Sequence, residues 1–138
     1  MATLQSAIEA IQDKVLTVAG VKNAPDSPSG VTGGSYPFVL TVSDGGVWEF
    51  GVAGEKLGLH NIRVEMHFPV KGLSWTVSKV MAYSDSIPNV LMKDPTLGGT
   101  VSTYGRIVYE FGPLGYMGID TIGFAWTLED VKMRSNAS

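Results

Sequence analysis

The run LHNIRVEMHFP, residues 59–69, alternates apolar and polar side chains over most of its length. The apolar members of the alternation are Ile62, Val64, Met66 and Phe68, and the polar members are Asn61, Arg63, Glu65 and His67. Because successive side chains of a strand point to opposite faces of a sheet, the run predicts a strand with one buried and one wet face. Pro69 ends this strand, because proline cannot donate a ladder hydrogen bond.

A helix, a loop and a hairpin are expected before this strand. Residues 3–18 repeat apolar side chains at helical spacing, which predicts an amphipathic helix. Glycine, proline and small polar residues fill 20–35, which predicts a long loop. Alternating runs at 38–42 and 48–52 flank the Gly-containing residues 44–46, and this pattern predicts two strands joined by a tight turn.

Two helices and two strands are expected after the strand at 59–69. Helical spacing predicts one helix over 72–84 and a short second helix over 87–93. Alternating residues predict strands at 101–111 and 121–131, and the glycine-rich residues 112–118 predict the connection between them.

The predicted fold class is α+β. We expect a mainly antiparallel sheet of about five strands, with the N-terminal helix and the central helix pair packed on one face. Residues 1–131 are expected to form a single domain, and residues 132–138 a flexible C-terminal tail.

Composition excludes several classes of function. The 138 residues include no cysteine, so disulfides, thiolate metal sites and cysteine nucleophiles are excluded. A formal net charge of −3 argues against a protein that grips duplex DNA, because tight binding needs a basic surface. We find no signal peptide pattern and no apolar run long enough to span a membrane, and expect synthesis in the cytoplasm.

No common catalytic arrangement is found. His60 and His67 are the only histidines, and their spacing places them on opposite faces of one strand, where they cannot share a metal. Each is expected to be an exposed polar residue. No glycine group has the setting of a phosphate-binding loop. We therefore predict no catalytic residue, no metal site and no cofactor.

The polar side of the central strand allows two interpretations. Arg63, Glu65 and His67 form either a solvated face with weak ion pairs or a charged stripe that lines a lumen or a subunit contact. Trp126 is expected in the core and Trp48 is expected to be exposed, where a tryptophan can anchor a partner.

The expected contact surface lies in three loops, at 20–35, 44–58 and 94–100, which are rich in glycine, proline and small polar residues. The candidate interface residues are Asp26, Ser27, Pro28, Gly33, Gly34, Asp44, Trp48, Glu55, Lys56, Asp94, Thr96 and Leu97.

The sequence resembles the tail terminator, or tail completion, family of long-tailed phages and related prophages. The resemblance rests on the run at 59–69 and on LMKDPTLGGTV at 91–101. Shorter matches lie at 19–25, 36–40, 111–114 and 121–128. It implies a structural virion protein that forms a hexameric ring, caps the tail tube, ends its elongation and offers a surface for head–tail joining.

The implied partners are further copies of the chain, the major tail tube protein and the head-completion or connector protein. DNA is expected to pass through the lumen without specific binding, and the protein is expected to assemble in the cytoplasm of the host bacterium and to reside in the virion. Another phage neck protein, such as a head–tail joining or connector protein, is the alternative. A small-ligand-binding module or an enzyme is the weaker alternative.

Overall fold

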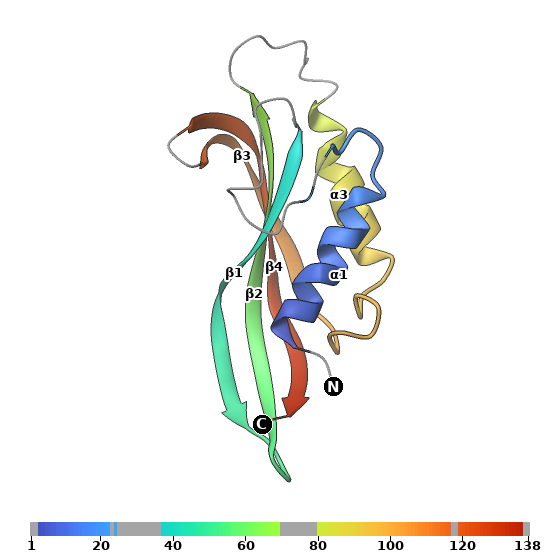
Figure 1. Cartoon of the computed structure of the whole chain (residues 1–138), viewed down its shortest axis with the longest axis vertical. Coiled ribbons are helices and arrows are strands. Elements are labelled where there is room, and N and C mark those ends of the chain that lie inside the picture. Colours follow the sequence, from blue (N-terminus) through green and yellow to red (C-terminus); the bar gives the residue numbers. More distant parts are fainter. Residues whose placement is uncertain (1–2, 23, 25–36, 70–79, 117–118, 137–138) are drawn as a thin grey trace.

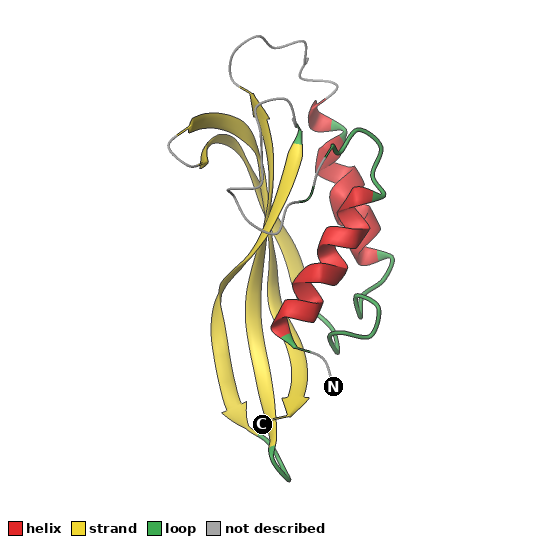
Figure 2. Ribbon diagram, viewed as in Figure 1, coloured by secondary structure: helices red, strands yellow, loops and turns green. Residues whose placement is uncertain are grey.

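The computed structural model describes residues 3–22, 24, 37–69, 80–116 and 119–136. The described elements are α1 (Leu4–Leu16), β1 (Phe38–Phe50), β2 (Glu55–Pro69), α3 (Tyr83–Met92), β3 (Arg106–Tyr116) and β4 (Ile119–Asn136). The strands form one antiparallel sheet in the order β1-β2-β4-β3, and both helices lie on one of its faces (Figures 1 and 2). We call this the helix-side face, and the opposite one the outer face.

The α+β class is confirmed, and the strand number is corrected. Four strands are described where the sequence predicts about five. The difference arises because β1 is one long strand where two strands and a turn were expected.

Helix α1 follows the predicted pattern. Thr3 caps it: the Thr3 hydroxyl accepts from the Ser6 amide at 3.1 Å, and the Thr3 amide donates to the Ser6 hydroxyl at 2.8 Å. Such a cap satisfies two backbone donors that the helix itself leaves without partners. Ile11 and Val15 are fully buried, so α1 turns its apolar stripe toward the sheet.

The core lies between the helix-side face and the two helices. The predicted inward residues of β2, Ile62, Val64, Met66 and Phe68, are all buried. They share one hydrophobic cluster with Ile11 of α1 and with Ile87 and Leu91 of α3, while Trp126 of β4 is also fully buried. The predicted inward face is therefore confirmed.

Residues 44–46 do not form the predicted hairpin turn. They lie inside β1 as a bulge, where one extra residue of β1 is accommodated between Ser43 and Gly46. Gly45 has φ +95°, which suits glycine in a bulge. The turn comes at residues 51–54, closed by a hydrogen bond from the Glu55 amide to the Val52 carbonyl at 3.1 Å.

Helix α3 replaces the predicted short helix at 87–93. It begins at Tyr83 and runs through Pro88 without the expected break, because burial of Ile87 and Leu91 favours one continuous helix. Most of the predicted helix at 72–84 lies outside the described residues.

The last two strands are shifted and longer than predicted. Strand β3 begins at Arg106 and continues through Gly112 and Pro113, where the sequence predicted a connection. An edge strand tolerates proline because one side of its ladder is free of partners. Strand β4 continues to Asn136, so residues 132–136 belong to the sheet and not to a C-terminal tail.

The sheet is longer than the helical layer. Its end at the bottom of Figure 1 is built from residues 46–60 and 131–136, and we call this part the arm. The β1 side of the arm extends beyond the helices, whereas Val131 and Met133 on its β4 side are still buried in the core. Two bulges mark the beginning of the arm at the same level on both sides of β2: the bulge at 44–45, and one in β4, where Asp130 has φ 56°. Bulges increase the local twist of a sheet, so the arm leaves the covered part in a new direction.

Candidate assembly surface

The arm exposes large apolar side chains. Phe50 is 102% exposed and Val52 80%, and both lie at the end of the arm. The exposed fractions of Val47, Trp48 and Leu59 are 54%, 41% and 39%. Several large apolar side chains exposed together on one segment are typical of a site that contacts another molecule.

On the helix-side face of the arm, the side chains around Trp48 pack tightly against one another. Trp48 meets the ring of His60 edge-on, with 4.4 Å between ring centroids, and Lys56 Nζ lies 4.2 Å above the Trp48 ring. A Cβ atom added at Gly58 would lie 2.4 Å from the His60 ring and 2.7 Å from the Trp48 ring. Gly58 is therefore required for this packing, which holds Trp48 in place.

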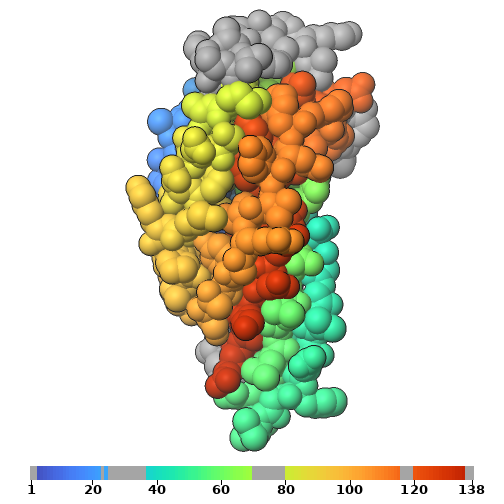
Figure 3. Space-filling model, turned by 180° about the vertical axis from the view of Figure 1, so that it is seen from behind, coloured from blue at the N-terminus to red at the C-terminus, as the bar shows by residue number. Residues whose placement is uncertain are grey.

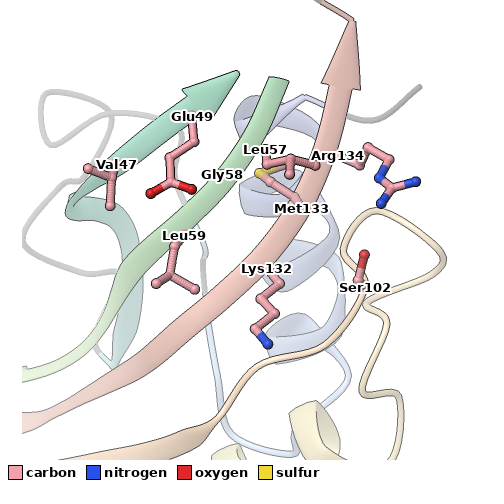
Figure 4. Close-up of a pocket in the computed structure, with 9 residues that line it drawn as sticks. All are labelled: Val47, Glu49, Leu57, Gly58, Leu59, Ser102, Lys132, Met133 and Arg134. Atoms are coloured by element: carbon pink, nitrogen blue, oxygen red, sulfur yellow. The ribbon is translucent and has the colours of Figure 1, made fainter. Parts of the chain in front are cut away.

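The outer face of the arm contains a groove of about 340 Å³. Figure 4 shows Val47, Leu57 and Leu59 projecting from β1 and β2 on this face. Glu49 stands at the β1 side, whereas Lys132 and Arg134 stand at the β4 side. The groove thus has an apolar floor with an acidic rim on one side and a basic rim on the other.

The predicted contact loop at 44–58 is not a loop but most of the arm. Asp44 lies exposed in the β1 bulge, and Trp48 is partly exposed as predicted. Glu55 and Lys56 begin β2, and the Glu55 carboxylate lies 3.5 Å from Arg134 Nε. The expectation that 44–58 is a loop is therefore wrong, because these residues form paired strands joined by the turn at 51–54.

Two of the three predicted contact residues at 94–97, Asp94 and Leu97, make contacts with other parts of the same chain. Asp94 pairs with Lys14 at 3.0 Å and accepts a hydrogen bond from the Gly98 amide at 2.8 Å. The pair with Lys14 is the main cause that lowers the pKa of Asp94. Thr96 is exposed, but Leu97 is fully buried in the core, so the expectation that Leu97 offers contact surface is wrong.

The candidate residues Asp26, Ser27, Pro28, Gly33 and Gly34 lie outside the described residues.

The polar stripe of β2 is a partly buried line of hydrogen-bonded side chains on the outer face. His67 is fully buried, although an exposed residue was expected, and its ring stacks on Phe38 at 4.8 Å. His67 Nε2 lies 2.9 Å from Glu65 Oε1, and Arg63 Nε donates to the other Glu65 oxygen at 2.5 Å. The hydrogen bond with His67 is the main cause that lowers the pKa of Glu65, with a further contribution from Arg63.

Thr121 of β4 extends this line, and sequence reasoning missed it. Its hydroxyl lies 2.6 Å from His67 Nδ1, so Thr121, His67 and Glu65 follow the order of a hydrolase triad. Thr121 is only 1% exposed, so a substrate carbonyl cannot reach its hydroxyl. The line therefore connects β2 to β4 inside the fold.

His60 is also buried, and the prediction that it is exposed is wrong. Only 3% of it is exposed, and its Nε2 has no hydrogen-bond partner among the described residues. Burial, followed by the nearby charge of Lys56, lowers its pKa. The prediction that the two histidines face opposite sides holds, because His60 shares the parity of Ile62 and His67 that of Arg63.

Sequence reasoning also missed most of the groove. Leu57, Leu59, Lys132 and Arg134 were not among the candidates. The alternation of Val47 and Glu49 with Trp48 and Phe50 indicates a strand, and apolar residues of both parities in that strand are the signal that could have indicated two contact faces.

Neither a family model nor a curated protein matches the chain. In the described ranges, no helix has the length and apolar character needed to cross a membrane. The same ranges hold no group of three or more His, Asp or Glu side chains placed to bind a metal.

Proposed function

We propose that the chain is a structural subunit of a long-tailed phage virion: a tail terminator that forms a hexameric ring, caps the tail tube, ends its elongation and provides the surface for head–tail joining. The observation that carries this proposal is the arm, whose β1 side extends past the helices and which exposes apolar residues on both of its faces. A subunit that works alone has no use for such a surface, whereas an assembling subunit needs one.

The sheet supports a ring because it offers different surfaces on its two sides. A closed ring arises when one surface of a subunit contacts a different surface of the next and the rotation closes. Strands β1 and β3 form the opposite edges of the sheet. Both edges carry exposed apolar side chains, among them Val42 on β1 and Val108 and Tyr109 on β3.

The charge of the chain fits passage of DNA. The formal net charge of −3 leaves no excess of cations to hold phosphates along a lumen. The proposed partners are further copies of the chain, the major tail tube protein on one side of the ring and the head-completion or connector protein on the other. The proposed location is the neck of the virion.

Inactivation of the gene in the phage or prophage that encodes it tests this function. We expect tails of irregular or excessive length that fail to join heads, because an uncapped tube continues to add subunits. Electron microscopy of the particles gives both the length distribution and the fraction of joined heads. Tails of normal length without heads would favour the alternative, a head–tail joining or connector protein. Normal, infectious particles would contradict both.

A further inference from the structure

We infer that the arms of neighbouring subunits stack face to back, so that the helix-side face of one arm fills the groove on the outer face of the next. The donor face carries Trp48, Phe50 and Lys56, and the acceptor groove is floored by Val47 and Leu59. The occupant of the groove is thus a second copy of this chain. This inference rests on the proposed ring and adds the contact that holds it.

The donor face is suited to docking because it is both apolar and rigid. Phe50 follows Trp48 on the same face of β1, and both are exposed. The Trp48 ring is fixed between His60 and Lys56. Fixed aromatic side chains lose little conformational entropy when they dock, which is why they dominate the binding energy of many interfaces.

The acceptor groove matches this face in chemistry. Its floor of Val47, Leu57 and Leu59 is apolar, so it can take an aromatic side chain. Glu49 stands on its rim and offers a negative charge to Lys56 of the incoming arm. Two sheets that stack face to face lie about 10 Å apart, which is the distance that such side chains fill.

The two surfaces point to a second copy because they lie on opposite faces of one element. The register places Trp48 opposite Gly58 and Val47 opposite Leu59, so donor and acceptor occupy the same level of the arm. A contact between them joins the front of one subunit to the back of the next. Such a contact is heterologous and repeats around a ring without a shift along its axis.

A cysteine pair tests the contact directly. The natural chain has no cysteine, so Phe50→Cys with Leu57→Cys introduces the only two thiols. These positions lie one register step apart on opposite faces of the arm, so their side chains point away from each other and cannot form a bond within one subunit. Mild oxidation of the assembled double variant should give a ladder of covalent multimers on a denaturing gel. Each single variant should remain monomeric on the same gel, because the contact is not between identical residues.

A matched control uses another exposed apolar position. Leu16 at the end of α1 is 48% exposed, close to the value for Trp48, and lies away from the arm (Figure 1). The pair Leu16→Cys with Leu57→Cys should give no ladder. Equal crosslinking of the control pair, or crosslinking of Phe50→Cys with itself, would overturn the face-to-back contact.

Charge reversal supplies an independent test. Lys56→Glu alone and Glu49→Lys alone should each weaken assembly by about tenfold or more, because like charges then face each other in the contact. The double variant restores opposite charges and should regain most of the lost assembly, as measured by sedimentation at increasing protein concentration. Assembled rings without the ladder and without this rescue would overturn the inference and leave the proposed ring intact. Absence of any ring, alone or on tail tubes, would overturn both.

Discussion

The covered half of the sheet and the arm use the same strands with opposite results. In the covered half, Val64 and Trp126 lie fully buried beneath the helices. In the arm, Trp48 and Phe50 continue the same helix-side face, but they are exposed because the helical layer ends before them (Figure 3 shows the arm projecting at the bottom). Alternation therefore defines the faces of a strand, whereas the length of the helices decides which part of a face is core and which part can bind.

The largest expected effect on stability comes from placing one charge, by the same valine-to-aspartate substitution, in each of the two regions. Val64→Asp should unfold the domain, because a buried charge without a partner costs several kcal/mol against a total stability of about 5 to 15 kcal/mol. Val47→Asp is the matched control on the arm, where the side chain is 54% exposed, and it should leave the fold intact. Circular dichroism and thermal unfolding measure both. A folded Val64→Asp protein would show that the assigned inward face is wrong.

The buried contact between Thr121 and His67 on the outer face should give the next largest effect. Thr121→Val keeps the shape of the side chain and removes the hydroxyl that lies 2.6 Å from His67 Nδ1. Loss of a buried hydrogen bond should lower the free energy of unfolding by about 1–3 kcal/mol. Thr127→Val on the same face of β4 is the control and should change it much less. If denaturant titrations showed that both variants lower the free energy of unfolding equally, the contact between Thr121 and His67 would have no special stabilising role.

The packing of His60 where the arm begins should make stability depend on pH. Its folded pKa lies below the usual value of 6.5, so the unfolded chain takes up a proton first as the pH falls through 6.5. The free energy of unfolding should therefore decline as the pH falls below 6.5, and no such loss should occur above it. The lowered pKa of Glu65 acts in a separate window, because its contribution is lost only below its usual value of 4.5.

The variant His60→Leu isolates this effect. It fills the site with an apolar side chain of comparable size and removes the titrating group. The decline of the free energy of unfolding just below pH 6.5 should therefore become smaller. Chemical denaturation of both proteins at pH 7.5 and pH 5.5 provides the comparison. An unchanged slope in the variant would assign the pH dependence to other groups.

The smallest effect on stability is expected at the end of the arm. Phe50→Ser should change the free energy of unfolding by less than about 0.5 kcal/mol, since the side chain is fully exposed. The same change should strongly reduce assembly, as measured by sedimentation. A folded variant that assembles like the natural protein would remove Phe50 from the contact.

Much of the fold could be predicted from local patterns. The inward residues of β2, the helix over 3–18 and the burial of Trp126 all follow from hydrophobic periodicity, because a packed core must cover one face of each element. The number of strands could not be predicted in this way. Residues 44–46 have the composition of a turn, and only pairing with β2 shows that they form a bulge.

The candidate site was predicted less completely, because it depends on contacts between distant residues. Leu59 belongs to the run that defines the central strand, but its exposure follows from its place in the groove on the outer face, which depends on the pairing with β1 and β4. Thr121 meets His67 across 54 positions of sequence, and no local pattern indicates that pair. Lys132 and Arg134 were assigned to a tail, since their pairing with β2 is also long-range.

The central claim, that this chain is a ring-forming part of the phage neck, is tested most directly by locating it in the virion. Particles assembled with an affinity-tagged chain would be labelled and viewed by electron microscopy, and the chain would be counted by quantitative mass spectrometry. The account predicts label at the head-proximal end of the tail and about six copies per particle, as one ring of the proposed hexameric kind requires. Absence from purified particles, or label spread along the tail with many copies, would contradict it.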